Sequence, residues 1–335
     1  MQEEQKNKIT YFHRHPKAGF SMGKVSQTYI QEIEKKWNVR QLYVPCYRAT
    51  PANCFRNIAF IFLNRNKNGI NHITGDIHYG ILALIGCKSV LTVHDTCGME
   101  NKNPIKKFLL SLLWYKIPLF LATKIVCISE KTRNDLLKII NRKDISVIYN
   151  AVDPLFLPVQ REFNKKTPIV LIIGTGWNKN LSNTVLALCN IACHLRIIGR
   201  LSSEQKILLE KNNIDYSNQC NLTDLEIVKE YNNCDIVSFC SVFEGFGMPP
   251  IEGNAVGRAV LTSKIEPMLE VVGDSDSALF IDPKDANSIR EGFLTIIHDD
   301  LLRSKRIQNG YKNTERFNAK NIANKYVELY NILLY

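Results

Sequence analysis

The sequence of 335 residues lacks features that mark several classes of protein. No two of its ten cysteines are spaced as Cys-x-x-Cys, which argues against a zinc site. Several cysteines lie inside apolar runs, where a free thiol acts as a small hydrophobic residue. The first residues, MQEEQKNKITYFHRH, contain neither an apolar run nor a cleavage site, so no secretory signal is predicted. We therefore expect a cytoplasmic protein with reduced thiols.

Long apolar runs are also missing. The longest, Phe108–Thr123, is shorter than the roughly 20 residues that a membrane-spanning helix needs, and Lys116 and Pro118 interrupt it. The wider segment 104–124 combines apolar, aromatic and basic residues, which is typical of a surface that lies on an anionic membrane. The alternative is a helix packed against the protein core with its lysines in solvent.

The composition excludes a disordered or fibrous chain, because 45% of the residues are apolar and 22% are charged. The 43 Lys and Arg residues exceed the 32 Asp and Glu residues, which gives a formal net charge of +11. Such an excess favours a polyanionic partner: nucleic acid, an anionic membrane or a phosphorylated ligand. The sequence contains no zinc finger and no basic-aromatic sheet motif, so nucleic acid is not expected as a partner.

Short apolar runs rich in β-branched residues alternate with helical patterns along the chain, which is typical of parallel sheets covered by helices. The expected strands of the first half are Ile9–Phe12, Gln41–Val44, Gly75–His78, Ser89–Val93, Lys124–Ile128 and Ser146–Tyr149. Those of the second half are Ile169–Ile173, His194–Ile198, Ile236–Phe239, Ala259–Leu261 and Ala278–Ile281. Helices are expected at Ser26–Trp37, Glu130–Ile140, Asn183–Ala192, Ser202–Asn212, Leu222–Asn232, Asp285–His298 and Asn321–Leu334.

Three prolines and a charged run between Asp153 and Pro168 separate the two series of elements. They predict two doubly wound α/β domains, 1–158 and 159–317, joined near residue 160. In such sheets ligands bind beyond the carboxyl ends of the strands, so candidate functional residues are sought there.

The segment Ser241–Glu252, SVFEGFGMPPIE, follows an expected strand and opens a helix. Its glycines permit close approach of a ligand, and its two prolines suit the first turn of a helix. The amides of Gly247 and Met248 would face an anion at the positive end of that helix. Glu244 and Glu252 could accept hydrogen bonds from a sugar and a ribose. The alternative is a Gly-Pro turn with two glutamates in solvent.

A second glycine-containing loop, GTGWNKN at 174–180, follows the expected strand Ile169–Ile173. Gly174 allows a close backbone approach, and Lys179 places a point charge suited to a diphosphate near a helix N-terminus. On its own, Lys179 is better interpreted as an ordinary surface lysine. Two glycines do not complete a Gly-x-Gly-x-x-Gly turn, which disfavours a dehydrogenase.

Residues 235–282 resemble the C-terminal domain of the retaining family-4 glycosyltransferases, also called glycosyl transferases group 1. EGFGMPPIE is similar to the E-x7-E motif of that family, and AVLTS, LEVVG and ALFIDP follow the family pattern. The similarity extends back through VIYNAVD, IVCISE and TVHDT to about residue 72. It implies the GT-B fold, with two Rossmann-like domains facing across a cleft. It also implies that a helix near 318–335 returns to the N-terminal domain.

The resemblance implies roles for the matched positions of the second half. Glu252 would bind the ribose of a nucleotide, and Glu244 would contact the donor sugar. The amides of Gly247 and Met248 would hold the diphosphate or the sugar.

The loop after Ile173 would hold the phosphates, with Gly174, Thr175 and Lys179 as donor-binding residues. The family usually adds an Arg a few residues before the Lys, but Thr175 and Asn178 stand in that region here. By sequence the phosphate clamp is therefore incomplete.

In the first half, His94 directly follows the expected strand Ser89–Val93. The resemblance implies that it faces the donor sugar, whereas the alternative is a histidine that only caps the strand end with hydrogen bonds. Asp95, His78 and Gly19 are assigned to the acceptor side. The segment GFSMG, which begins at Gly19, is also similar to the family's N-terminal glycine loop near the phosphates.

The resemblance implies a reaction as well. A hexose-type sugar would move from a UDP- or GDP-linked donor to a hydroxyl of a glycan or lipid-linked acceptor, with retention at the anomeric carbon, in bacterial surface polysaccharide synthesis. Neither a metal nor a cofactor besides the donor would be needed. The leaving diphosphate would itself take the acceptor proton. The missing Arg keeps open a catalytically silent GT-B subunit that binds a glycan or a partner.

Overall fold

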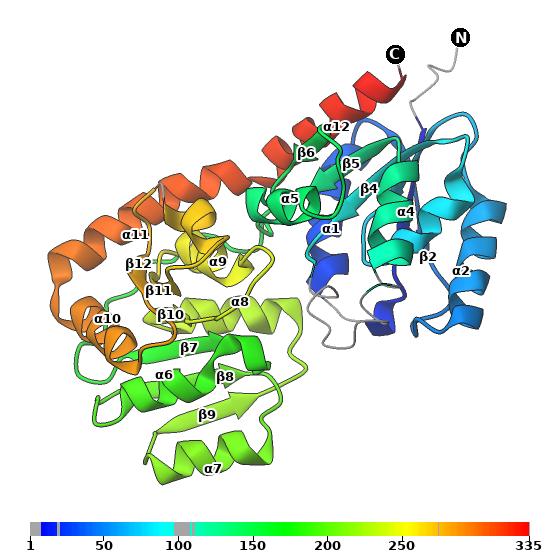
Figure 1. The fold of residues 1–335 in the computed structure, drawn as a ribbon. Coiled ribbons are helices and arrows are strands. Elements are labelled where there is room, and N and C mark those ends of the chain that lie inside the picture. The colour runs from blue at the N-terminus through cyan, green and yellow to red at the C-terminus, as the bar shows by residue number, and fades with distance from the viewer. Residues whose placement is uncertain (1–7, 19–20, 97–107, 109–110, 274, 335) are drawn as a thin grey trace. The chain divides into compact units, whose positions relative to one another are not determined.

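The computed structural model describes residues 8–18, 21–96, 108, 111–273 and 275–334 (Figure 1). The chain divides into two compact units. Unit 1 comprises residues up to Ala151 together with residues from Ala319 onward, and unit 2 comprises Val152–Asn318. Each unit contains a six-stranded sheet whose neighbouring strands are all parallel. The expected class, two Rossmann-like α/β domains, is confirmed.

The sheet of unit 1 places its strands in the order β2 (Asn38–Tyr43), β1 (Lys8–His13), β3 (Ile70–Ile73), β4 (Lys88–Val93), β5 (Lys124–Cys127) and β6 (Ile145–Val147). Its helices are α1 (Ser21–Glu34), α2 (Pro51–Asn64), α4 (Ile117–Leu121), α5 (Glu130–Leu137) and α12 (Ala319–Leu334). Short helical segments lie at η1 (Pro16–Ala18), η2 (His78–Leu84) and η4 (Ser111–Lys116).

Both faces of this sheet are buried, because neighbouring residues of a strand point to opposite faces. On one face Phe12 and Leu91 join a core with residues of α2, α4 and α5. On the other face Tyr11 and Val90 pack with residues of α1 and α12. The near-continuous apolar runs of these strands follow from this double covering.

The C-terminal helix α12 is fastened to unit 1 by a buried polar network as well as by apolar contacts. The hydroxyl of Tyr330 lies 2.9 Å from that of Tyr11 and 2.6 Å from Nδ1 of His72. Nε2 of His72 contacts Oγ1 of Thr92 at 2.8 Å. Every polar group of this cluster therefore has a partner without water, which burial requires.

One expected strand is wrong. The strand predicted at Gly75–His78 instead lies at Ile70–Ile73 and pairs with β1 and β4. The polar residues Asn71 and His72 interrupt the apolar run, so the sequence pattern does not indicate a strand at this place. Both side chains are fully buried and hydrogen-bonded. Gly75 belongs to the turn before η2.

The sheet of unit 2 has the order β12 (Leu279–Ile281), β11 (Ala259–Ser263), β10 (Ile236–Phe239), β7 (Ile169–Ile173), β8 (His194–Ile198) and β9 (Tyr216–Gln219). Its helices are α6 (Leu181–Leu188), α7 (Ser203–Lys211), α8 (Asp224–Asn233), α9 (Met248–Val256), α10 (Ala286–His298) and α11 (Asp300–Thr314). Short helical segments lie at η5 (Trp177–Lys179), η6 (Leu269–Gly273) and η7 (Glu315–Phe317).

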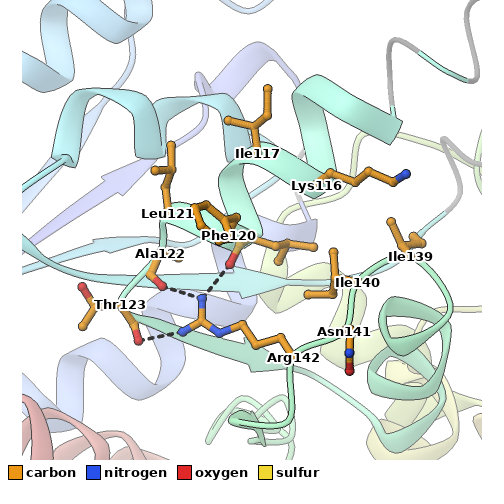
Figure 2. A pocket seen from close by; sticks show the side chains of 11 residues that line it. Lys116, Ile117, Phe120, Leu121, Ala122, Thr123, Ile139, Ile140, Asn141 and Arg142 are labelled. Carbon is orange, nitrogen blue, oxygen red and sulfur yellow. Dashed lines mark hydrogen bonds between the residues drawn. The ribbon is translucent and has the colours of Figure 1, made fainter.

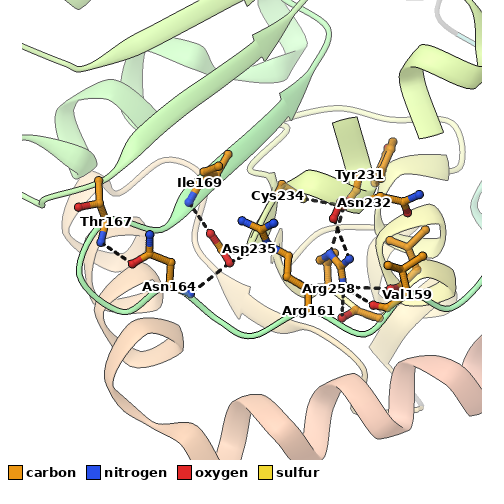
Figure 3. Close-up of polar contacts among 12 residues, drawn as sticks. Val159, Arg161, Asn164, Thr167, Ile169, Tyr231, Asn232, Cys234, Asp235 and Arg258 are labelled. Atoms are coloured by element: carbon orange, nitrogen blue, oxygen red, sulfur yellow. Dashed lines mark hydrogen bonds and ion pairs between the residues drawn. The ribbon is translucent and has the colours of Figure 1, made fainter. Parts of the chain in front are cut away.

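The proline-rich segment 153–168 is bound to unit 2, so the unit boundary falls at 151/152 rather than at 158/159. Figure 3 shows two anchors. The carboxylate of Asp235 accepts hydrogen bonds from Nε of Arg161 and from the amides of Asn164 and Ile169. The buried guanidinium of Arg258 donates to the carbonyl of Val159 at 2.9 Å and to four further carbonyls.

The nine described cysteines are all free. Cys127, Cys193, Cys234 and Cys240 are buried in the sheet cores, whereas Cys220 is exposed. Among the described helices, none combines the length and the apolar character that crossing a membrane requires.

Candidate active site

The candidate residues of unit 2 gather at the carboxyl edge of its sheet. Strands β10 and β7 are neighbours at its centre, so the loops that follow them meet at that edge. The backbone carbonyl of Asn178 accepts a hydrogen bond from the amide of Val242 at 2.8 Å, which joins the two loops directly. The side chain of Asn180 adds bonds to the carbonyls of Cys240 and Pro283. This is the position where ligands bind in doubly wound sheets.

An ion pair forms the centre of this edge. Nζ of Lys179 lies 2.7 Å from Oε1 of Glu244, and Nδ2 of Asn178 donates to the same oxygen at 3.1 Å. The ammonium group also lies 4.6 Å from the centre of the Phe239 ring. The side chains of Lys179 and Glu244 are only 21% and 13% exposed. A lysine that the sequence alone suggests to be a surface residue is thus held by Glu244 and by the ring of Phe239.

The backbone conformation of the loop after β7 explains why a glycine stands at position 174. Gly174 has a φ of 89°, and a Cβ atom added there would lie 3.1 Å from Cε of Lys179. A larger residue would therefore be strained and would displace the lysine. Thr175 has a structural role, because its hydroxyl donates to the carbonyl of Arg200 at 2.6 Å.

The N-terminus of α9 has no side-chain cap. Gly247 precedes the helix with a φ of 107°. Pro249 and Pro250 occupy the first turn and carry no N–H, so Met248 supplies the amide of that turn. This end of the helix carries a partial positive charge that suits an anion.

Glu252 is oriented by a residue that the sequence analysis did not single out. The hydroxyl of Tyr231, on α8, donates a hydrogen bond to Oε2 of Glu252. Burial raises the pKa of Tyr231 well above its usual value, and the neighbouring carboxylate raises it further. The tyrosine therefore stays protonated as a donor and fixes one carboxylate oxygen.

Two further polar groups lie at the same edge. The hydroxyls of Ser241 and Ser263 are buried at the ends of β10 and β11, and neither has a hydrogen-bond partner in the described part of the chain. Buried hydroxyls without partners are rare and mark places where a ligand or a water molecule binds.

In unit 1, polar side chains follow β1, β3 and β4 at the carboxyl edge of that sheet. His94 follows β4, is buried, and contacts the carbonyl of Thr74 through Nε2 at 3.1 Å. A carbonyl oxygen only accepts, so Nε2 donates and Nδ1 of the neutral ring is the acceptor. Burial lowers the pKa of His94, which keeps it neutral at pH 7. This contact agrees with the strand-capping alternative and leaves an acceptor atom for a ligand.

The other candidates of unit 1 have structural contacts as well. His78, at the start of η2, contacts the carbonyl of Trp114 through Nδ1 at 2.9 Å, and burial lowers its pKa. The backbone carbonyl of Asp95 accepts a hydrogen bond from Tyr115 at 3.4 Å. Gly19 lies outside the described residues.

Two arginines at these edges were missed. Arg14 directly follows β1 and pairs with Asp76 at 3.4 Å. Arg200 follows β8, next to the loop that contains Thr175, and its side chain is exposed. The signal that would have found both is a basic residue just beyond a strand. No group of three or more His, Cys, Asp or Glu side chains in the described residues is arranged to hold a metal ion.

A cavity of about 870 Å³ in unit 1 lies elsewhere. Figure 2 shows Arg142 at its wall, donating to the carbonyls of Leu119, Ala122 and Thr123. Because Thr123 and Arg142 precede β5 and β6, this cavity opens at the amino edge of the sheet. It is therefore separate from the candidate site.

Comparison with known proteins agrees with this geometry. Residues 153–313 match the family described as glycosyl transferases group 1, and residues 46–155 match glycosyltransferase family 4. The two matches overlap at residues 153–155 and together run from the loop after β2 into α11.

Two curated bacterial relatives cover most of the chain. The first is the N-acetylgalactosamine-N,N'-diacetylbacillosaminyl-diphospho-undecaprenol 4-alpha-N-acetylgalactosaminyltransferase of Campylobacter jejuni. It is 28% identical over 292 residues, which are 82% of this chain and 74% of the relative. The capsular polysaccharide biosynthesis glycosyltransferase CapM of Staphylococcus aureus is 25% identical over 76% of this chain and 74% of its own length.

Solved structures share the fold across nearly the whole chain. The sucrose-phosphate synthase of Thermosynechococcus elongatus has a TM-score of 0.79 at 17% identity and covers 98% of this chain and 99% of its own. Anabaena HepE in complex with UDP-glucose has a TM-score of 0.79 at 14% identity, over 97% and 99% of the two chains. The fold of this chain is therefore GT-B.

Proposed function

Because the chain belongs to the glycosyl transferases group 1, or family 4, glycosyltransferases, we propose that it transfers a hexose-type sugar from a UDP- or GDP-linked donor to a hydroxyl of a glycan or lipid-linked acceptor. The observation that carries this proposal is made at the carboxyl edge of the unit 2 sheet. Lys179, Glu244 and the uncapped N-terminus of α9 come together there. A cation and a helix N-terminus suit a diphosphate, and a carboxylate accepts hydrogen bonds from sugar hydroxyls.

We assign the donor's parts to separate residues. Lys179 and the amides of Gly247 and Met248 hold the diphosphate, with Gly174 and Thr175 shaping the loop beneath it. Glu252, oriented by Tyr231, binds the ribose hydroxyls. Glu244 accepts a hydrogen bond from the sugar. His94 of unit 1 is assigned to a sugar hydroxyl and Asp95 and His78 to the acceptor side, as the resemblance implies.

The proposed reaction retains the anomeric configuration and needs no metal. The bond between the anomeric carbon and the diphosphate oxygen breaks, and negative charge develops on the leaving diphosphate. Lys179 and the end of α9 stabilise that charge more strongly than they stabilise the ground state. The acceptor hydroxyl bonds to the anomeric carbon on the face the diphosphate leaves, and a diphosphate oxygen takes its proton.

The acceptor class rests on the relatives. The Campylobacter relative acts, by its name, on a diphospho-undecaprenol acceptor, and the Staphylococcus relative serves capsular polysaccharide synthesis. We extend a glycan or lipid-linked acceptor to this chain, in bacterial surface polysaccharide synthesis at the inner face of the plasma membrane.

A peripheral membrane contact through 104–124 belongs to the same proposal. In the described part of this segment, Phe120 is 82% exposed and Phe108 is 64% exposed. The cavity beside α4 is lined by apolar Ile117, Phe120 and Ile140 with basic Lys116 at its edge. Lys106 and Lys107 lie outside the described residues. Exposed aromatic rings next to cations suit the surface of an anionic bilayer.

The test of the proposed function is a donor assay in which UDP- and GDP-sugars are incubated with a diphospho-undecaprenol-linked glycan. We expect one nucleoside diphosphate to be released in step with an extended acceptor whose new linkage has the donor's anomeric configuration, with or without a chelator. Nucleotide binding without transfer to any acceptor would instead favour the catalytically silent subunit.

A further inference from the structure

The net charge of the chain is concentrated in one unit. Unit 1 contains 25 Lys and Arg residues against 11 Asp and Glu residues, a net charge of +14. Unit 2 contains 18 against 21, a net charge of −3. The diphosphate site proposed above lies in unit 2, so a phosphorylated donor does not account for this excess. The positive charge of unit 1 therefore favours a polyanionic partner other than the sugar donor.

A local excess of positive charge surrounds α2. Between Glu34 and Asp76 the chain contains seven Lys and Arg residues and no acidic residue. Five of these cations are Arg40, Arg48, Arg56, Arg65 and Lys67, and none of the five forms an ion pair with another described residue. Within the described part of unit 1, their charge is thus not compensated by an ion pair.

The outer face of α2 is apolar rather than polar. The inner side of the helix buries Asn57 and Ile61. On the outside, Phe55 is 72% exposed, Phe62 is 52% exposed and Leu63 is 81% exposed. A helix at the surface of a water-soluble protein normally turns charged residues outward, so this face differs from the usual pattern.

Cations and aromatic rings are combined on this surface. The guanidinium carbon of Arg65 lies 3.5 Å from the centre of the Phe62 ring, and that of Arg48 lies 5.4 Å from the centre of the Tyr47 ring. Both rings are about half exposed. Nη1 of Arg65 also donates to the carbonyl of Ala83 at 3.4 Å. A guanidinium stacked on an exposed ring keeps its remaining N–H donors available for phosphate oxygens.

We propose that the outer face of α2, with Phe55, Phe62 and Leu63 and the cations Arg48 and Arg56 beside them, docks unit 1 onto an anionic lipid bilayer. The aromatic and aliphatic side chains enter the headgroup region, and the guanidinium groups bind lipid phosphates. A bilayer supplies both an apolar layer and a negative surface. A second copy of this chain would instead bring two units of charge +14 together, which disfavours self-association.

The inference extends the membrane contact of the proposed function to a second helix, but it rests on separate residues. Helices α2 and α4 both pack on η2, and Figure 1 shows them on the same side of the unit 1 sheet. Phe120 of α4 therefore belongs to the same helix layer as the outer face of α2.

The test is co-sedimentation of the full chain with vesicles of phosphatidylcholine mixed with phosphatidylglycerol, compared with vesicles of phosphatidylcholine alone. We expect binding to the mixed vesicles only, weakened by salt. The double variant Phe55→Ser with Leu63→Ser should weaken binding at least about tenfold, since each side chain leaves an apolar layer. Arg48→Glu with Arg56→Glu should have an effect of about the same size.

Matched controls come from unit 2. Leu225→Ser with Leu301→Ser removes equally exposed apolar groups, and Lys206→Glu with Lys211→Glu reverses exposed charges. Both controls should sediment nearly as the wild type does. Equal binding to both vesicle types, wild-type binding by the α2 variants, or binding of an acidic protein or nucleic acid in place of vesicles would overturn the proposal.

A second readout separates this inference from the proposed function. Thermal stabilisation by UDP or GDP is measured on the same variants. The α2 variants should keep the wild-type nucleotide response while losing vesicle binding. A protein that binds no vesicles yet responds to a nucleotide contradicts only the docking surface, and one that binds vesicles without a nucleotide response contradicts only the donor site.

Discussion

Nζ of Lys179 lies 2.7 Å from Oε1 of Glu244, although 65 positions separate the two residues in the chain. The cation assigned to the diphosphate is thus already paired with the carboxylate assigned to the sugar. In the proposed reaction the two residues act together: a departing diphosphate competes with Glu244 for Lys179, and Glu244 becomes available to the sugar.

Substituting Glu244→Gln tests this coupling. The amide removes the negative charge beside Lys179 and retains the shape of the side chain, so a free nucleoside diphosphate should bind several-fold more tightly. Sugar transfer should fall about a hundredfold in kcat, because an amide is a weaker acceptor for a sugar hydroxyl. Calorimetric titration and turnover assays give the two values. A parallel loss of binding and turnover would contradict the coupling.

The Tyr231→Phe variant tests the orientation of Glu252. The ring should still pack edge-on against Phe156, whose centre lies 5.2 Å away, so the fold should be kept. Loss of the hydroxyl frees the carboxylate and should weaken nucleotide binding about tenfold, the cost of one hydrogen bond to a charged group. Turnover at saturating donor should change little. Unaltered affinity would remove Tyr231 from the account of the ribose site.

Arg258 should be central to the stability of unit 2. Its guanidinium is buried and bonds only to carbonyl oxygens, including that of Val159 in the proline-rich segment. Replacing it as Arg258→Met leaves several buried carbonyls without donors and should lower the free energy of unfolding by about 3 kcal/mol. Urea titration measures the change, and exposed Lys211→Met serves as the control. A loss no larger than the control's would show that water replaces the guanidinium.

Unit 1 should lose stability in mild acid. Burial lowers the pKa of His13 to about 4, and it lowers that of His72 well below its usual value. An unfolded histidine titrates near 6.5, so below that pH the unfolded chain binds more protons than the folded one and the free energy of unfolding falls. His13 alone should contribute a loss of about 2 kcal/mol on going from pH 7 to about pH 5.

Urea unfolding at the two pH values measures this dependence. A His13→Asn variant is expected to be less stable throughout but to depend less steeply on pH. The exposed His298→Gln change should leave the dependence as in the wild type. Stability that rises toward acid pH would refute the assignment of neutral buried histidines.

The sequence predicts much of unit 2 because its signals are local. The apolar runs of β7, β8 and β10 begin and end at the predicted residues. β9 was missed, because Tyr216–Gln219 is a half-exposed edge strand without an apolar run. Helix α2 was also missed, since apolar residues on both of its sides obscure the helical period.

The candidate site residues were proposed from local signals, the glycine, lysine and histidine residues just beyond strands, and from the family resemblance that singles out Glu244 and Glu252. Their relationships were not. Nothing near Glu252 in the sequence indicates that Tyr231 orients it, and nothing near Lys179 indicates its pairing with Glu244. Such contacts depend on which strands are neighbours in the sheet, and strand order is a property of the whole fold.

The most direct test of the donor site is the thermal stabilisation of the wild type and of Lys179→Met by UDP and by GDP. One nucleotide should raise the Tm of the wild type by several degrees, and Lys179→Met should lose most of that shift. The surface variant Lys206→Met should respond as the wild type does. Equal stabilisation of wild type and Lys179→Met, or no response to either nucleotide, would contradict the central claim.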